Sequence, residues 1–208
     1  MVASTDRRRL EVAGVQRSPK VLLLMLGAAV GAGISPALAD DAWTVTKPYP
    51  DNPLREASIA GKVHVGDSTE QSTLTIGCRA DDDGAVMTAS FVVPDTLDFQ
   101  FGMFEGPGGV GEDEELLSVA LQDTDPVTHN VSGWHSDDVE FTFSYLLPQD
   151  EASRWREHAG EELTMAVHLA TAEDLPPAGL RAEFDLPEDA RGLSDVIAPC
   201  LAATVINR

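Results

Sequence analysis

The chain has 208 residues, and its 35 acidic against 14 basic side chains give it a formal net charge of −21 at pH 7. A field of this sign repels nucleic acid and anionic lipid, which excludes both as the expected partner and favours cationic partners or Ca²⁺. The acidic residues are spread along the chain and not gathered in one tail, so they also suit a solvated surface.

Residues 1–39 are predicted to be a secretory signal peptide. Basic residues, including the arginines at 7–9, precede a short apolar run at 21–30, and Ala-Leu-Ala at 37–39 fits a cleavage site. The run is shorter than the roughly 20 apolar residues that a membrane-spanning helix needs. We therefore expect a periplasmic protein whose exported part, 40–208, is one β-rich domain large enough to bury a core and without a membrane span.

Alternation of apolar and polar residues predicts strands over much of this domain. An extended arm at 40–54 comes first, with Trp43 as its large anchor. Strands are then expected at 57–65, 72–81, 85–93 and 97–103. The segment 105–115, rich in glycine and glutamate, has the most flexible composition in the chain.

The second half of the domain continues the pattern. Strands are expected at 116–121, 127–134, 139–145, 163–169 and 180–186. A short helix is expected after Pro148, and Pro187 suits the first turn of an amphipathic last helix that leads to Cys200. Eight or nine short strands with two short helices indicate a mainly β, single-domain antiparallel β-sandwich-like fold with one helix C-terminal.

Cys78 and Cys200 are the only cysteines in the chain. Two cysteines in an exported protein favour a disulfide, and these two lack the C-x-x-C spacing of a metal site. Cys78 shares the inward face of its strand with Leu74 and Ile76. We therefore expect a core-facing bond between Cys78 and Cys200 that fastens the last helix to the sheet.

The segment 131–140 holds the most suggestive polar side chains. The ingredients of nucleophilic catalysis are present in His135, in Asp137 or Asp138, and in Ser132, Ser136 or Ser144. No G-x-S-x-G turn presents a serine, and residues adjacent in sequence rarely form a triad, so an ordinary polar turn is the preferred interpretation. Tryptophans such as Trp134 and Trp155 are more often core anchors than platforms for a ligand.

Two acidic runs, 81–83 and 112–115, carry oxygen ligands of the kind that Ca²⁺ takes. Their acids are consecutive and do not match the spacing of a calcium-binding loop, so weak counter-ion binding is the preferred interpretation. The other histidines show no metal-binding spacing. The sequence therefore predicts neither a metal site nor a cofactor.

Several short motifs share their order with a known family. They are Trp43, the strand 74–78, Trp134 with Ser136 and Asp137 or Asp138, a short helix, the strand from Leu163, and Phe184-Asp185-Leu186 before the last helix and Cys200. This order resembles the VasI/TagO family of periplasmic proteins associated with type VI secretion. The chain differs from it in Gly77, where a basic residue is expected, and in the segment 105–115. The resemblance implies an accessory role and carries over no active-site residues.

These observations predict an exported, non-enzymatic accessory or interaction protein that binds an envelope or secretion-system protein. The candidate partner-binding residues are Trp134, Ser136, Asp137 and Asp138. A Ca²⁺- or glycan-binding β-sandwich module is the alternative, and a hydrolase that uses His135 is the third interpretation. The oligomeric state is left open.

Overall fold

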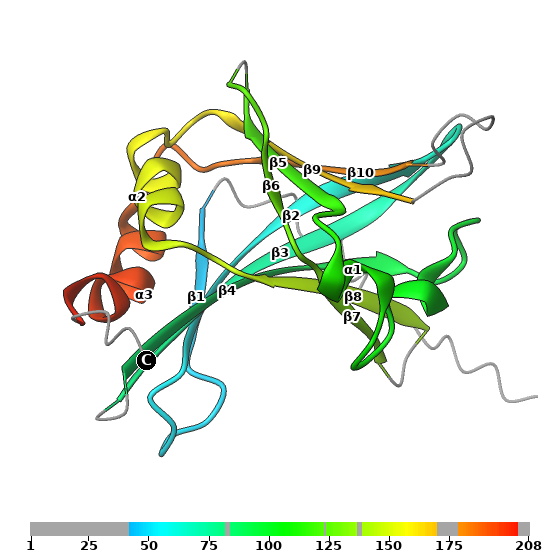
Figure 1. Cartoon of the computed structure of the whole chain (residues 1–208). Helices are drawn as coiled ribbons and strands as arrows, with labels where there is room; N and C mark the ends of the chain where they lie inside the picture. Colours follow the sequence, from blue (N-terminus) through cyan, green and yellow to red (C-terminus); the bar gives the residue numbers. More distant parts are fainter. Residues whose placement is uncertain (1–41, 82–83, 123, 137–138, 170–178, 204–208) are drawn as a thin grey trace, which may run out of the picture. The chain divides into compact units, whose positions relative to one another are not determined.

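Among the residues that the computed structural model describes, 42–81, 84–122, 124–136, 139–169 and 179–203, ten strands form one antiparallel sheet (Figure 1). In chain order the strands are β1 (Thr44–Thr46), β2 (Arg55–Val65), β3 (Ser68–Asp81), β4 (Gly84–Pro94), β5 (Leu117–Leu121), β6 (Val127–His129), β7 (Ser132–Ser136), β8 (Glu140–Leu146), β9 (Glu162–His168) and β10 (Gly179–Asp185). The helices are the 3₁₀ helix η1 (Phe101–Phe104), α1 (Val110–Asp113), α2 (Gln149–Glu157) and α3 (Arg191–Ala202). The predicted mainly β fold with a C-terminal helix is confirmed, while the predicted signal peptide lies outside the described residues.

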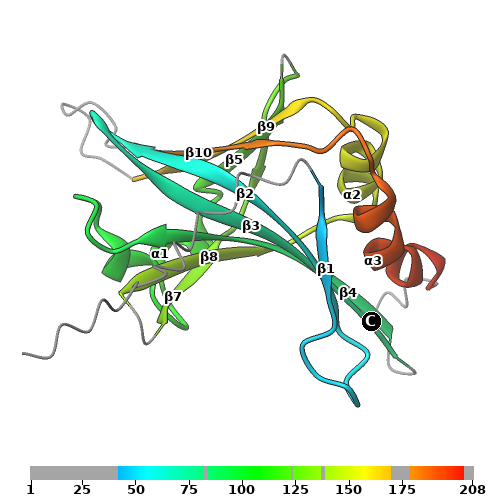
Figure 2. The same ribbon diagram turned by 180° about the vertical axis from the view of Figure 1, so that it is seen from behind.

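The sheet is strongly curled, because its two outermost strands are neighbours in the chain. Across the sheet the order is β6-β5-β9-β10-β2-β3-β4-β8-β7, with β1 paired to β2 beside this path. Only Asn130 and Val131 separate β6 from β7, so the two ends of the sheet are joined by three Cα–Cα steps, about 11 Å at most. Figures 1 and 2 show β9 and β10 in one layer and β7 and β8 in the other. The layers expected for a sandwich thus belong to one continuous sheet.

The inner face of this sheet encloses the hydrophobic core. Alternation places one side chain in two on this face, which is why the period-two pattern identified most strands. The rings of Phe91 and Phe143 stack with centroids 5.3 Å apart, and Phe91 meets Phe184 edge-on at 6.4 Å. These contacts join strands of both layers, so the core is one cluster.

Residues between β4 and β5 pack against the junction between the two ends of the sheet, β6 and β7, which we call the seam. The N–H of Val131 donates to the carbonyl of Gly111 over 2.6 Å, and the N–H of Gly106 donates to the carbonyl of Gly133 over 3.0 Å. A Cβ at Gly111 would collide with the Val131 carbonyl oxygen, so only glycine allows this close approach. The segment 105–115, expected to be flexible from its composition, therefore contains a short helix that packs against the seam.

Two predicted strands differ in the structure. The strand predicted at 97–103 is wrong: Phe101 begins η1, and its ring packs against those of Phe99 and Phe141, with centroids 5.1 and 5.0 Å away. The alternating aromatic residues there pack into the core from a loop and a 3₁₀ helix, not from a strand. The strand predicted at 127–134 is two strands, β6 and β7, because the chain crosses the seam between them.

Helices α2 and α3 lie side by side at one end of the sheet (Figures 1 and 2). Trp155 of α2 is fully buried, as expected of a core anchor, and the Gln149 side chain donates to the Cys200 carbonyl over 2.8 Å. Cys200 forms the predicted disulfide with Cys78, with Cα atoms 6.0 Å apart. In the described part of the chain, no helix has the length and apolar character needed to cross a membrane.

Candidate functional site

Trp134 lies in the middle of the edge strand β7 and is 47% exposed. Side chains two residues apart on a strand share a face, so Ser132 and Ser136 flank Trp134 on the outer surface of the sheet. The structure thus brings together two of the predicted partner-binding residues, Trp134 and Ser136. The other two, Asp137 and Asp138, lie outside the described residues.

The pairing of β7 with β8 supplies the remaining neighbours of Trp134. Thr142 stands directly opposite Trp134 in the register, at a Cβ separation of about 5 Å. Glu140 and Ser144 are opposite Ser136 and Ser132, so they occupy the diagonal positions, within reach of an indole ring. Four hydroxyls and one carboxylate therefore surround the exposed ring.

Three of these four hydroxyls make no hydrogen bond to another described residue. Ser136 Oγ donates to the carbonyl of Glu140 over 3.2 Å. The side chains of Ser132, Thr142 and Ser144 make no hydrogen bond among the described residues. Thr142 is nevertheless only 9% exposed. The Thr142 hydroxyl is not among the buried, unpartnered polar atoms of the described residues, so it reaches the surface beside Trp134 and is open to water or to a ligand.

The hydroxyls at this site begin a longer row, which we call the hydroxyl row. One position on each of six adjacent strands falls in register, and every one carries a hydroxyl: Thr44, Ser58, Thr75, Ser90, Ser144 and Ser132. In the part farther from Trp134, Ser58 and Thr75 are bonded to each other over 2.9 Å and Ser90 donates to the Thr75 carbonyl over 3.4 Å. The sequence could not reveal this row, because it depends on which strands pair and in what register.

His135 lies on the other face of β7 from the serines. Its Nδ1 is 3.4 Å from a carboxylate oxygen of Glu105, and its ring meets Phe141 edge-on at 4.9 Å. Ser132 and Ser136 point to the opposite side of the strand. The described residues of this segment therefore do not form the serine–histidine pair that the hydrolase interpretation requires.

A second polar cluster surrounds Glu151, in the first turn of α2. Glu151 is only 3% exposed, the one charged residue of the described chain that is fully buried. The hydroxyl of Tyr145 donates to Glu151 Oε1 over 2.8 Å, and the ring of His129 lies 4.5 Å from that of Tyr145. Burial, followed by the neighbouring carboxylate, raises the pKa of Tyr145 well above 10.

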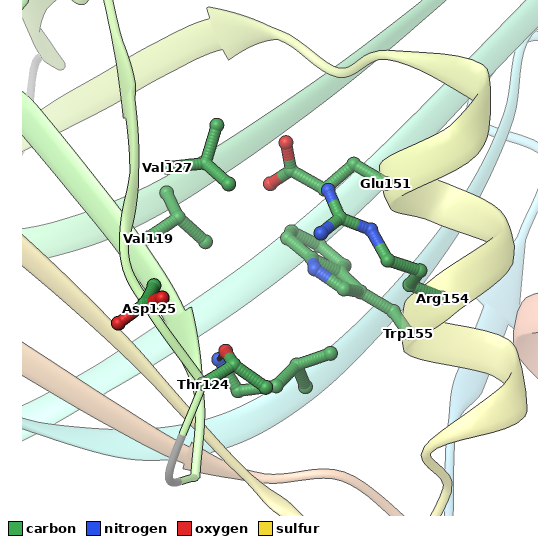
Figure 3. Close-up of a pocket in the computed structure, with 8 residues that line it drawn as sticks. Val119, Thr124, Asp125, Val127, Glu151, Arg154 and Trp155 are labelled. Atoms are coloured by element: carbon green, nitrogen blue, oxygen red, sulfur yellow. Dashed lines mark hydrogen bonds between the residues drawn. The ribbon is translucent and has the colours of Figure 1, made fainter.

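His129 Nε2 lies 2.8 Å from Glu151 Oε2, the distance of an ion pair. The direction of approach does not make a hydrogen bond, so both atoms keep unused hydrogen-bonding capacity. Figure 3 shows Glu151, Arg154 and Trp155 projecting from α2 toward Val119 and Val127. The hollow between them measures about 10 Å³, which is room for about one water molecule. This cluster ties α2 to the sheet and is too tight for a substrate.

Sequence reasoning missed the Glu151 cluster. Tyr145 stood out only as the end of an apolar alternation, while His129 and Glu151 come from different elements. Of the acidic runs considered for Ca²⁺, Asp82 and Asp83 lie outside the described residues. Within the described ranges, no three His, Cys, Asp or Glu side chains are grouped as a metal site.

Comparison of the chain with protein-family models, with curated proteins and with solved structures finds no match. The resemblance to the VasI/TagO family therefore stays a prediction from the order of short motifs.

Proposed function

We propose that this chain is an exported, non-catalytic accessory protein that acts by binding a component of the cell envelope through the surface around Trp134. One observation carries the proposal: a tryptophan that is 47% exposed on the outer face of a well-packed sheet. Tryptophan is highly buried on average and is enriched at the centres of binding sites, where its large ring supplies contact area at low entropic cost.

The surroundings of Trp134 suit a preformed binding surface. β7 is held on one side by β8 and on the other by the contact between Gly106 and Gly133. A side chain on a strand fixed from both sides is positioned more accurately than one on a loop. The disulfide between Cys78 and Cys200 stabilises the sheet itself and takes no part in the contact.

An association with a type VI secretion system is the narrower form of this proposal. Its support is the order of the motifs from Trp43 to Cys200. The envelope or secretion-system protein named as the partner on that basis remains a prediction, as does export to the periplasm.

Cross-linking in the periplasm of cells that make the protein tests the proposal. We expect wild-type protein to form a discrete cross-linked species and Trp134→Ala to lose it. Val86→Ala is the matched control, because Val86 is also an exposed apolar residue, 52% exposed, and lies six residues along β4 from the Val92 that adjoins Thr142, about 20 Å away. Equal cross-linking of both variants and wild type would refute the proposal.

A further inference from the structure

We infer that the component bound at Trp134 is a neutral glycan, lying on the hydroxyl row. This inference rests on the proposed function and names the chemical class of its ligand. It is carried by the unbonded hydroxyls beside Trp134 and by the absence of charge along the rows of residues that contain them.

The two ends of the hydroxyl row differ in their hydrogen bonding, and the difference indicates a ligand at the end beside Trp134. Far from Trp134, the hydroxyls of Ser58 and Thr75 satisfy each other. Beside Trp134, those of Ser132, Thr142 and Ser144 have no partner among the described residues, and none of the three is a buried atom, so all are open to a ligand. Each hydroxyl is both a donor and an acceptor, which is the hydrogen-bonding character of a sugar hydroxyl. A ligand bearing hydroxyls would satisfy the three groups that the sheet leaves open.

The indole ring complements these hydroxyls. A sugar ring has an apolar face of C–H groups and a rim of hydroxyls, so it can cover an exposed aromatic face while its rim reaches polar neighbours. Thr142 stands about 5 Å from Trp134 across the strands. Glu140, on the diagonal, adds an acceptor for a further hydroxyl of the ligand.

The charge of this surface favours a neutral ligand. The row that contains Trp134 continues through Thr142, Val92, Thr73 and Ala60, and neither it nor the hydroxyl row carries a charged residue. At the Ala60 end of that row, a hollow of about 350 Å³ is lined by Ala60 and by Lys62, Glu162, Glu183 and Asp185, three acids and one lysine.

A cationic partner would be drawn to those acids, and an anionic one would be repelled by a net charge of −21. A neutral ligand is therefore the class that matches the two uncharged rows beside Trp134. Six strands at a spacing of about 4.8 Å make the hydroxyl row roughly 24 Å long, enough for an oligosaccharide of several units.

Tryptophan fluorescence of the full exported chain tests the inference. The other two tryptophans, Trp43 and Trp155, are buried at 9% and 1% exposure, so a change caused by a ligand at the surface reports on Trp134. The probes are two neutral oligosaccharides, cellohexaose and chitohexaose, within a neutral glycan array, and the anionic polygalacturonate. We expect saturable binding of at least one neutral glycan and none of polygalacturonate.

Three variants locate the site, and their glycan binding is measured by calorimetric titration, because Trp134→Ala removes the fluorescent reporter. Trp134→Ala should weaken glycan binding at least about tenfold. Thr142→Val, which keeps the shape and removes only the hydroxyl, should weaken it several-fold. Ser58→Ala, in the same row but bonded to Thr75, should bind like wild type. Thermal melts that match wild type show that each variant is folded.

The outcomes separate this inference from the proposed function. If folded wild type binds no neutral glycan, or binds polygalacturonate as well, the inference is overturned. It is also overturned if Thr142→Val and Ser58→Ala behave alike. If cross-linking at Trp134 then still yields a protein that Trp134→Ala loses, the proposed function stands with a protein as its partner. If Trp134→Ala leaves both cross-linking and glycan binding unchanged, both proposals fail.

Discussion

The hydroxyl of Tyr145 on β8 donates a 2.8 Å hydrogen bond to Glu151 on α2, and both side chains are buried. This bond joins the sheet to the helix that covers one end of it. The carboxylate also has His129 at ion-pair distance. A single buried acid thus connects three elements, β6, β8 and α2.

Removing that acid should destabilise the fold. Glu151→Ala leaves the Tyr145 hydroxyl and the His129 ring without their partner, so we expect the free energy of unfolding to fall by roughly 2–4 kcal/mol. Urea denaturation followed by far-UV circular dichroism measures it. Asp150→Ala is the control: the Asp150 side chain is 82% exposed and its ion pair with Arg154 spans 3.9 Å, so we expect a change within about 0.5 kcal/mol. Equal losses in the two variants would contradict the role assigned to Glu151.

Stability should fall at alkaline pH because of Tyr145. The folded protein holds the pKa of Tyr145 well above 10, so below pH 10 the tyrosine is neutral in both states and its contribution is fully present. Above pH 10 the unfolded chain releases a proton that the folded protein keeps, and the free energy of unfolding decreases as the pH rises.

Tyrosinate absorbance in a Tyr49→Phe variant measures this directly, because the chain has two tyrosines. We expect Tyr145 to ionise only as the protein unfolds. Ionisation at pH 10 with the fold intact would contradict the prediction.

Loss of the disulfide should lower thermal stability markedly. The bond between Cys78 and Cys200 spans 122 residues, and in the chain-entropy model a loop of this length stabilises the fold by on the order of 4–5 kcal/mol. We expect Cys78→Ser, with Cys200→Ser in the same chain, to melt well below the oxidised wild type in calorimetry. Wild type treated with a reductant should approach the variant. An unchanged melting temperature would exclude a stabilising role for the bond.

Val139, before β8, holds an unfavourable backbone conformation. Its φ is +65° and its side chain is 68% exposed, so it has the cost of the left-handed region, about 1–2 kcal/mol for a residue with a Cβ, and little packing in return. Val139→Gly should therefore raise the free energy of unfolding by about 1 kcal/mol. The same replacement at Val45, in strand β1 and 49% exposed, should lower it. Chemical denaturation compares the two, and a loss in both would show that Val139 is not strained.

Gly111 should tolerate no side chain. A Cβ there would meet the Val131 carbonyl at the seam, so Gly111→Ala should destabilise the protein by about 1–3 kcal/mol. At Gly102, in η1, a Cβ would have no atom within 4 Å, and Gly102→Ala should be nearly neutral. Thermal melts of the two variants test whether the segment 105–115 seals the sheet. Similar melting temperatures would argue against it.

The parts of the fold that could be predicted are the strands and helices that bury one face and expose the other. Leu74, Ile76 and Cys78 alternate because only one face of β3 meets the core, and the last helix shows its buried stripe for the same reason. The alternation at 97–103 led to a wrong prediction, because Phe101 is buried and Phe99 partly buried by packing against other rings and not by strand pairing.

The candidate site was predicted only in part. Trp134 and Ser136 were named from their place in a motif. Thr142, Ser144 and the hydroxyl row could not be, because a single strand carries no record of its partner's register. The hydrogen bond between Tyr145 and Glu151 could not be predicted for a similar reason, since it depends on where α2 packs against the sheet.

Closing the seam leaves little open edge in the sheet that the structure describes. The strands at the ends of the sheet order are short, three residues in β6 and five in β7, and backbone groups of Val131 and Gly133 are already bonded to Gly111 and Gly106. Unpaired edges are the usual template on which another chain adds a strand and begins to aggregate. A ten-stranded sheet that brings its own ends together should therefore resist edge-to-edge association at the high concentrations of a crowded compartment.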